Sequence, residues 1–367
     1  MRTLNTFIAL VCLIVFLNLS LVAHAQTPST TPPADETLEG TITKVISQKD
    51  FMVDKKKQTE QKLELIITDG SIKGKKIIVE NGNMATTNNQ LYAVGDQVVV
   101  NYGKGQDSNA TYITDHVRRQ PLLILSFIFV LLVIAIGRLK GFTSLISLAV
   151  SFFFIMQMIL PQIQQGTDPI VIVILASLFI IPITFYLSHG LNKKTTIAII
   201  ATFVSLITAG AFIAVFSRFL YFTGFTSDEA SFLQVMSGSI NMKDLMLAGI
   251  LIGSLGAIND ITVSQAAVIF QLREANAKLT WKELYKKGMN VGQDHIGSMV
   301  NTLVLVYAGA SLPLLLLFAN NQKPFGQVIN FEIIAVEVFR TLIGSIILVL
   351  AVPFTSLLAA VVAARSR

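Results

Sequence analysis

One carboxylate stands inside an apolar stretch that is long enough to cross a lipid bilayer. The stretch runs from Leu245 to Phe270, and Asp260 is its only charged residue. An ionisable side chain at bilayer depth is costly, and it is usually retained for work such as ion or proton transfer. The structural alternative is that Asp260 caps or braces packed helices. We interpret Asp260, together with Asn259 before it, as part of a functional polar site.

The next apolar stretch, Val291–Phe318, carries polar residues that can complete this site. If the two stretches are adjacent antiparallel helices, Asn301 lies at a depth similar to that of Asp260. Ser264 follows Asp260 by four residues and therefore shares its helix face. Histidine titrates near neutral pH, so His295 can take part in a stepwise proton path.

Small residues support close contact between these two stretches. Gly249, Gly253, Gly256 and Ala257 precede Asp260, and small residues let helix backbones approach within a membrane. The sequence therefore predicts a polar seam between the two spans. Its proton or ion candidates are Asp260, Asn259, Asn301, Asp294, His295 and Ser264.

A second pair of charges lies in the last apolar stretch, Ile333–Val362. Glu337 and Arg340 are three residues apart, which places them on one face of a helix. We favour a structural ion pair for them, and a contact with substrate is the alternative.

The composition indicates a membrane protein. Hydrophobic residues make up 53% of the chain and charged residues only 14%, with a mean hydropathy of +0.65, whereas a soluble domain carries about 25% charged residues. The net charge of +6 does not form one basic patch. Basic residues fall mainly in loops between apolar runs, so nucleic acid is not expected as a partner. The expected partners are the lipid bilayer, an unidentified substrate or protein, and a possible second copy of the chain.

Several kinds of chemistry lack sequence support. The chain has no HExxH, no phosphate-binding GxxxxGK[ST] loop and no GxSxG. Its only cysteine, Cys12, lies in the N-terminal apolar run, so no disulfide and no cysteine metal site is predicted. We therefore expect neither an enzyme nor a bound cofactor or metal.

The N-terminus is typical of a secretory signal peptide. Arg2 precedes an apolar core, and Ala23-His24-Ala25 forms a small-x-small cleavage site. We expect a signal peptide at residues 1–25, with an uncleaved anchor as the alternative. A Pro/Thr-rich linker then covers residues 26–37.

An exported β domain is expected at residues 38–117. Five short runs with β-rich or alternating character are separated by turn signals such as Asn81-Gly82 and Gly95-Asp96. Five such strands predict a small closed or nearly closed β-barrel of the OB-like type, outside the cytoplasm.

Residues 118–367 are expected to form an α-helical polytopic membrane domain. The apolar runs are 121–137, 141–160, 169–187, 195–216, 245–270, 291–318 and 333–362. Each is close to or above the roughly 20 residues that span a bilayer. About seven transmembrane helices after an exported domain place the C-terminus in the cytoplasm, and the chain in the cell membrane.

The distribution of basic residues agrees with this topology. Loops predicted to be cytoplasmic carry most of them, as the positive-inside rule requires. These residues are Arg138, Lys140, Lys193, Lys194, Arg273, Lys278, Lys282, Lys286, Lys287, Arg365 and Arg367. The outer loops between spans hold only Arg218, Lys243 and Lys323.

Three segments resemble one known family. GSLGAINDITVSQAAV, GMNVGQDHIGSMVNTLVLVYAGASLPLLLLF and FRTLIGSIILVLAVPFTSLL are similar to the YibE/F-like bacterial membrane proteins, and the exported β domain fits as well. The resemblance implies a multi-pass membrane protein and assigns no catalytic residue. The chain departs from the family pattern at two positions. Asn259 stands directly before Asp260, and Gln265 stands where the family often has small residues.

A second resemblance covers one motif. GAINDITVSQAAVIFQLREAN is similar to an Asn-Asp-Thr-Val segment of SecF-type export proteins. In that group a membrane carboxylate takes part in proton-driven work, and Asn259 and Asp260 occupy the corresponding positions.

Two classes of function follow from the sequence. One is a transporter or export-related factor that uses a proton or ion gradient through the polar seam. The other is a non-transporting membrane scaffold or sensor, whose exported β domain binds a partner.

Overall fold

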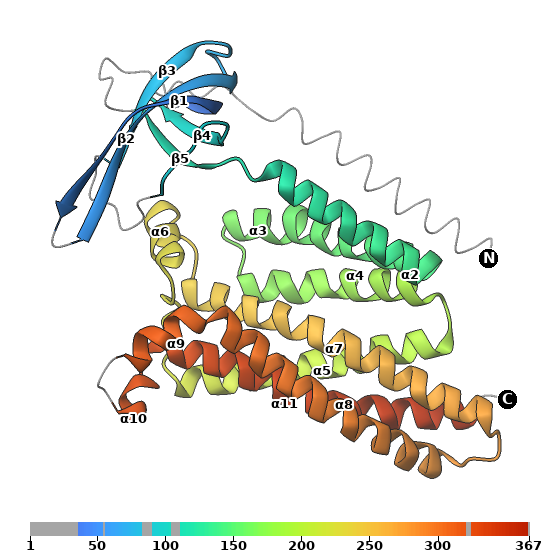
Figure 1. Cartoon of the computed structure of the whole chain (residues 1–367). Helices are drawn as coiled ribbons and strands as arrows, with labels where there is room; N and C mark the ends of the chain where they lie inside the picture. The colour runs from blue at the N-terminus through green and yellow to red at the C-terminus, as the bar shows by residue number, and fades with distance from the viewer. Residues whose placement is uncertain (1–35, 54–55, 83–89, 104–110, 321–323, 366–367) are drawn as a thin grey trace. The chain divides into compact units, whose positions relative to one another are not determined.

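The computed structural model describes residues 36–53, 56–82, 90–103, 111–320 and 324–365. The predicted signal peptide and nearly all of the predicted linker lie outside these residues. The chain divides into two compact units, one ending at Leu132 and the other beginning at Val133. Figure 1 shows a strand-rich unit and a helical unit.

The strand-rich unit is one antiparallel sheet. Its strands are β1 (Glu36–Val53), β2 (Lys56–Asp69), β3 (Lys76–Asn81), β4 (Gln97–Tyr102) and β5 (Tyr112–His116). They are hydrogen-bonded in the order β3-β2-β1-β4-β5. Strand β1 begins at Glu36, so the sheet starts inside the range predicted as linker, 26–37.

Alternation of apolar residues builds the core of this sheet. Leu63, Leu65 and Ile67 alternate along β2, and each is at most 1% exposed. Val98 and Val100 do the same on β4. Because successive side chains of a strand point to opposite faces, this alternation buries one face of the sheet.

Of the predicted closed or nearly closed barrel, the closed form is wrong, although the edge strands β3 and β5 lie near each other. The sheet is open, since β3 and β5 are its edges and no ladder joins them in the described part of the chain. Strands β1 and β2 span 18 and 14 residues. Only the first residues of β1, Glu36–Thr41, pair with β4, and only Gln61–Ile66 of β2 pair with β3. The rest of the β1–β2 hairpin extends past the other strands instead of closing a barrel.

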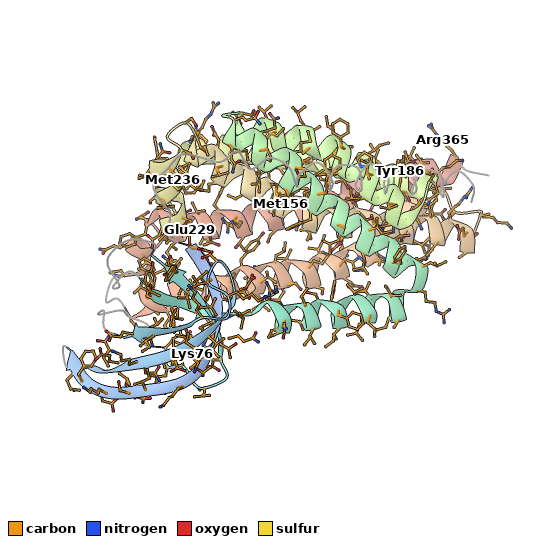
Figure 2. All side chains as sticks on the ribbon, turned by 90° about the horizontal axis from the view of Figure 1, so that it is seen from above. Lys76, Met156, Tyr186, Glu229, Met236 and Arg365 are labelled. Atoms are coloured by element: carbon orange, nitrogen blue, oxygen red, sulfur yellow. The ribbon has the colours of Figure 1, made fainter. Side chains whose placement is uncertain are left out.

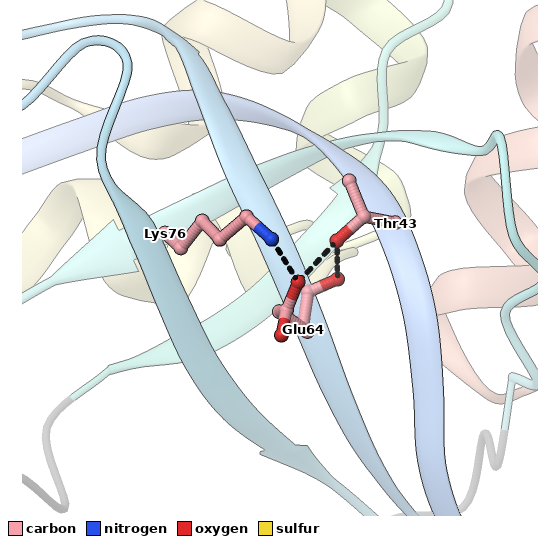
Figure 3. Close-up of polar contacts among 3 residues, drawn as sticks. All are labelled: Thr43, Glu64 and Lys76. Atoms are coloured by element: carbon pink, nitrogen blue, oxygen red, sulfur yellow. Dashed lines mark hydrogen bonds and ion pairs between the residues drawn. The ribbon is translucent and has the colours of Figure 1, made fainter.

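A carboxylate on β2 ties three strands together (Figure 3). Glu64 accepts a hydrogen bond from the Thr43 hydroxyl of β1 at 3.0 Å, and it forms an ion pair with Lys76 of β3 at 2.9 Å. The bonds from Lys76 and then Thr43 lower the pKa of Glu64 from its ordinary value. At the end of β5, the Arg118 guanidinium lowers the pKa of Asp115 in the same way.

We expect the β unit to fold alone and to lose stability in acid. It has its own hydrophobic core, so residues 36–117 should give a soluble protein with a β-type circular-dichroism spectrum. A carboxyl group whose pKa is lowered by folding stabilises the fold above its unfolded pKa, and this contribution is lost as the pH falls through the folded value. The thermal midpoint should therefore fall as the pH drops below about 4. Lys76→Met should flatten this dependence, and a disordered spectrum at neutral pH would contradict an autonomous unit.

The helical elements follow in the order α2 to α11. They are α2 (Arg119–Phe154), η3 (Ile155–Ile159), α3 (Leu160–Gln164), α4 (Pro169–His189), α5 (Lys193–Phe219), α6 (Asp228–Met236), α7 (Met242–Ala275), α8 (Trp281–Ala310), α9 (Leu312–Ala319), α10 (Phe325–Val328) and α11 (Glu332–Arg365). Helix α11 packs against α5, α7 and α8, and α7 also packs against α4 and α5.

Among the described residues, five helices are long and apolar enough to cross a membrane. The number is six if α8 and α9, which are bent by 71° relative to each other, form one span. This count is lower than the predicted number of about seven because residues 119–164 form one helical run of 46 residues.

The long run is broken at Arg138. This residue has φ 51° and ψ −133°, which is not helical. A β-carbon on Gly141 would collide with the carbonyl oxygen of Val133, although eight residues of a straight helix would separate them by about 12 Å. The chain therefore reverses sharply here, and only glycine fits at position 141.

Polar caps fix the ends of several helices. The Asp168 carboxylate accepts hydrogen bonds from two backbone N–H groups in the first turn of α4, and Ser227 caps α6. The Glu332 carboxylate at the start of α11 accepts bonds from the backbone N–H groups of Thr223 and Gly224 at 2.7 and 2.8 Å. This contact fastens the segment between α5 and α6 to α11.

The helical unit has two chemically different ends (Figure 2). Tyr186 and Arg365 lie at one end, and Glu229 and Met236 of α6 lie at the other. The turns between α4 and α5 and between α7 and α8 are at the Arg365 end (Figure 1). Most of the basic residues that the sequence places in loops therefore belong to that end.

Candidate functional site

Asp260 lies near the middle of α7, a helix of 34 residues. Its side chain is exposed, and it makes no hydrogen bond or ion pair with the residues that the structure describes. The charge that acts on it is that of His189, from the end of α4. An ionisable group is thus held in the middle of a long apolar helix without a hydrogen-bond or ion-pair partner among the described residues.

Asp260 belongs to a row of small and polar residues on α7, which we call the α7 open face. The row consists of Gly249, Gly253, Gly256, Asp260 and Ser264, and all five are exposed. Added β-carbons at Gly249 and Gly256 would meet no atom within 4 Å. Figure 1 shows α7 between α4 and α8, and both of these helices pack against it.

Side chains from α4 and α8 flank the α7 open face. His189 of α4 interacts electrostatically with Asp260. The Tyr307 hydroxyl of α8 lies 3.4 Å from the position that a β-carbon on Gly253 would take. His189 is therefore close enough to Asp260 for an electrostatic interaction, and it lies toward the basic end.

The sequence analysis did not include His189 in the site. Lys194 and Lys140 also interact electrostatically with His189. His189 therefore interacts both with Asp260 and with charges at the basic end of the unit. A hydrogen bond of 2.7 Å between Ser147 of α2 and Ser188 of α4 holds these helices together. No local sequence signal pairs α4 with α7, because this contact depends on tertiary packing.

A buried layer of hydroxyl groups joins α5 to α7 behind Asp260. The hydroxyls of Thr202 and Thr262 are hydrogen-bonded at 2.8 Å, and both residues are 0% exposed. Because α5 and α7 run antiparallel, one turn along each helix brings Ser205 to the level of Asn259. The sequence analysis included Asn259 but missed the three hydroxyls.

Five buried side-chain atoms of the helical unit have no hydrogen-bond partner among the described residues. Two of them are the facing pair, the hydroxyl of Ser205 and the Oδ1 atom of Asn259. The others are Oε1 of Gln265, Nδ1 of His295 and Oγ of Ser345. Buried polar atoms normally bind a protein group, water or an ion, so these five atoms are available to water or to an ion.

The polar link between α7 and α8 in the described residues is made by Gln265. Its Nε2 atom donates to the carbonyl of Gly288 in α8 at 2.8 Å and to the hydroxyl of Ser356 in α11 at 2.7 Å. Gly288 and Gly292 are buried, and they leave room for the amide. The residue noted as a departure from the family pattern is therefore the polar link between three helices.

The structure does not bring Asn301 or Asp294 to Asp260 by a hydrogen bond or ion pair within the described ranges. Both residues are exposed on α8. Asp294 lies two residues after the buried Gly292, which is about 200° around a helix. Asn301 likewise lies two residues after Met299, and Met299 packs against α7 and α11. Both side chains therefore lie on the side of α8 that faces away from these helices.

The remaining predicted residues have separate environments. His295 is half-buried on α8, and Ser264 lies one turn from Asp260 on the α7 open face. Glu337 and Arg340 form an ion pair in α11, with Nη1 and Oε1 3.1 Å apart. No group of three or more His, Cys, Asp or Glu side chains that could hold a metal ion occurs in the described residues.

Comparison with known proteins gives one match. The sequence model of the family described as YibE/F-like protein matches residues 125–365, which is well over half of the chain. A search of curated proteins found no match, and neither did a search of solved structures. The matched range covers every residue of the candidate site.

Proposed function

The chain belongs to the YibE/F-like family, and from this premise we propose that it is a membrane protein that moves a proton or an ion by way of Asp260. The proposal rests on one observation above all. Asp260 is an exposed carboxylate in the middle of an apolar helix, without a hydrogen bond or ion pair in the described part of the chain. A carboxylate that only braced helices would be expected to have a partner, because an unpaired charge in hydrocarbon is costly.

The surroundings of Asp260 support a path for a proton or an ion that begins at the basic end of the helical unit. From the basic end, the path would pass His189 and reach Asp260, with Ser264 beside it. It would continue past the unpartnered atoms of Asn259 and Ser205. Histidine and a carboxylate can exchange protons near neutral pH, and the glycines of the α7 open face leave space on the far side.

The proposed topology has seven spans, with residues 119–164 divided at Arg138 and α8 and α9 taken as one. Tags at Asn192 and at the C-terminus should report the cytoplasm, because these positions lie at the basic end. A tag in the loop of residues 162–167 should report the outside. A reporter enzyme that is active on one side of the membrane measures this directly. The opposite report at any of the three positions would overturn the topology.

Flux measurements test the transport proposal. The purified full-length protein would be reconstituted in liposomes with a pH-sensitive dye inside, and a pH gradient and a membrane potential would be imposed. We expect faster proton movement than in liposomes that contain no protein. Sodium and potassium gradients in parallel would identify another coupling ion. If none of these gradients dissipates faster than in empty liposomes, the uncoupled movement of protons or these ions is excluded.

One feature of the β unit favours a second candidate function, that of a scaffold or sensor. The extended end of the β1–β2 hairpin exposes Phe51 and Met52, at 36% and 68%. Exposed apolar side chains on a projecting hairpin suit a protein partner outside the membrane. Deleting this hairpin end should abolish partner capture and leave liposome flux unchanged, which separates the two functions.

A further inference from the structure

Helix α8 exposes a second set of polar residues, which we call the α8 polar stripe. It consists of Asn290, Asp294, Gly297 and Asn301, and each of the four is exposed. None of the three polar side chains makes a hydrogen bond or ion pair with the described residues. The proposed ion path does not use the stripe, because it lies on the side of α8 that faces away from α7 and α11.

The stripe lies at the depth of the membrane core. Gln265 of α7 contacts Gly288 and Gly292 of α8, and Tyr307 of α8 reaches Gly253 of α7. These contacts place Gly297 and Asn301 level with the middle of α7, near Asp260. Polar side chains at this depth rarely face lipid, because lipid offers them no hydrogen bond.

The spacing of the stripe is that of a helix-pairing seam. Its members are separated by four, three and four residues, and Val304 and Ala308 continue the pattern. Such a seam stays on one side of a helix and allows a second helix to pack along it. Gly297 has no atom within 4 Å of an added β-carbon, so a partner helix can approach closely.

The chemistry of the stripe fits an identical partner. All copies of a membrane protein have the same orientation, so a two-fold axis along the membrane normal sets each residue opposite its own copy. An asparagine amide both donates and accepts hydrogen bonds, so two Asn301 side chains can satisfy each other. The same axis sets the two Asp294 carboxylates opposite each other, so they would share a proton, and Asn290, one turn from Asp294, can donate to the Asp294 carboxylate of the second copy.

We propose that the protein is a homodimer in the membrane, formed by the α8 polar stripes of two copies. Beyond Gly292, α8 has no buried residue within one copy of the chain, and the dimer covers this half of the helix. Each copy keeps its own Asp260, so the dimer brings two separate paths together.

Cysteine cross-linking tests the dimer in the full-length protein. Cys12→Ser removes the only thiol of the chain, and single cysteines are then introduced by Val304→Cys or Val306→Cys. The two valines are exposed, at 43% and 59%, but lie on opposite sides of α8. Mild oxidation of purified protein in liposomes should link Val304→Cys into a disulfide dimer at least five times more efficiently than Val306→Cys.

A second substitution links the result to the polar stripe. Asn301→Leu in the Val304→Cys protein should reduce the dimer at least fivefold, whereas Thr302→Val, on another side of the helix, should leave it unchanged. Equal cross-linking at the two valines, or dimer formation that survives Asn301→Leu, would overturn the proposal. So would the absence of a dimer together with rapid labelling of Val304→Cys by a water-soluble thiol reagent, because the stripe would then line water.

Discussion

Asp260→Asn is expected to abolish gradient-driven flux and to leave the amount of folded protein unchanged. Asparagine keeps the size of the side chain and its capacity for hydrogen bonds, but it cannot ionise. The exposed position of Asp260 on α7 means that this change disturbs no packed neighbour. We expect flux in liposomes to fall to the level of empty liposomes, at least tenfold, with a thermal midpoint in detergent close to that of the wild type.

Matched variants separate ion transfer from bracing. Asp260→Glu keeps the ionisable group and should retain part of the flux, whereas Ser264→Ala, one turn away, should have a small effect. His189→Gln should slow proton entry without abolishing it, and His295→Ala should cause a milder loss. If Asp260 only braces helices, Asp260→Asn will leave the flux nearly unchanged and Asp260→Leu will destabilise the protein. Full activity of Asp260→Asn would therefore refute the coupled mechanism.

The sequence was sufficient to identify Asp260, because a charge in an apolar stretch is visible without a structure. The number of strands in the β unit was also correct. Their closure was not predictable, because strand number is the same in an open sheet and in a barrel, and only the pairing partners differ.

The partners of Asp260 were beyond the sequence for a different reason. In α7, apolar and small residues surround the helix nearly all the way round, so periodicity does not show which face is inside. The glycines of α7 were taken as a contact surface, but they are exposed, and Gly288 and Gly292 of α8 form the close contact instead. Only the three-dimensional packing shows that Gln265 joins α7 to α8 and α11.

That contact leads to the largest expected effect on stability, from Gly292→Ala. A β-carbon at Gly292 would collide with Cγ1 of Val352 and lie 3.1 Å from Nε2 of Gln265. Both neighbours are 0% exposed and belong to packed helices, so neither can move without disturbing α7 or α11. Overpacking of this kind costs about 1–3 kcal/mol, and we expect the thermal midpoint in detergent to fall by roughly 2–12 °C.

Two controls make this prediction specific to the three-helix contact. Gly309→Ala, on the same helix but outside the α8 polar stripe, adds the same methyl group where no atom lies within 4 Å, and it should leave the midpoint unchanged. Adding Val352→Ala to Gly292→Ala should recover part of the lost stability, because it removes the colliding methyl group, and the double-mutant cycle should show coupling between the two positions. Equal midpoints for Gly292→Ala and Gly309→Ala would mean that α8 does not pack tightly on Gln265. The polar link between α7, α8 and α11 would then have to be abandoned, whereas the exposed position of Asp260, on another face of α7, would be unaffected.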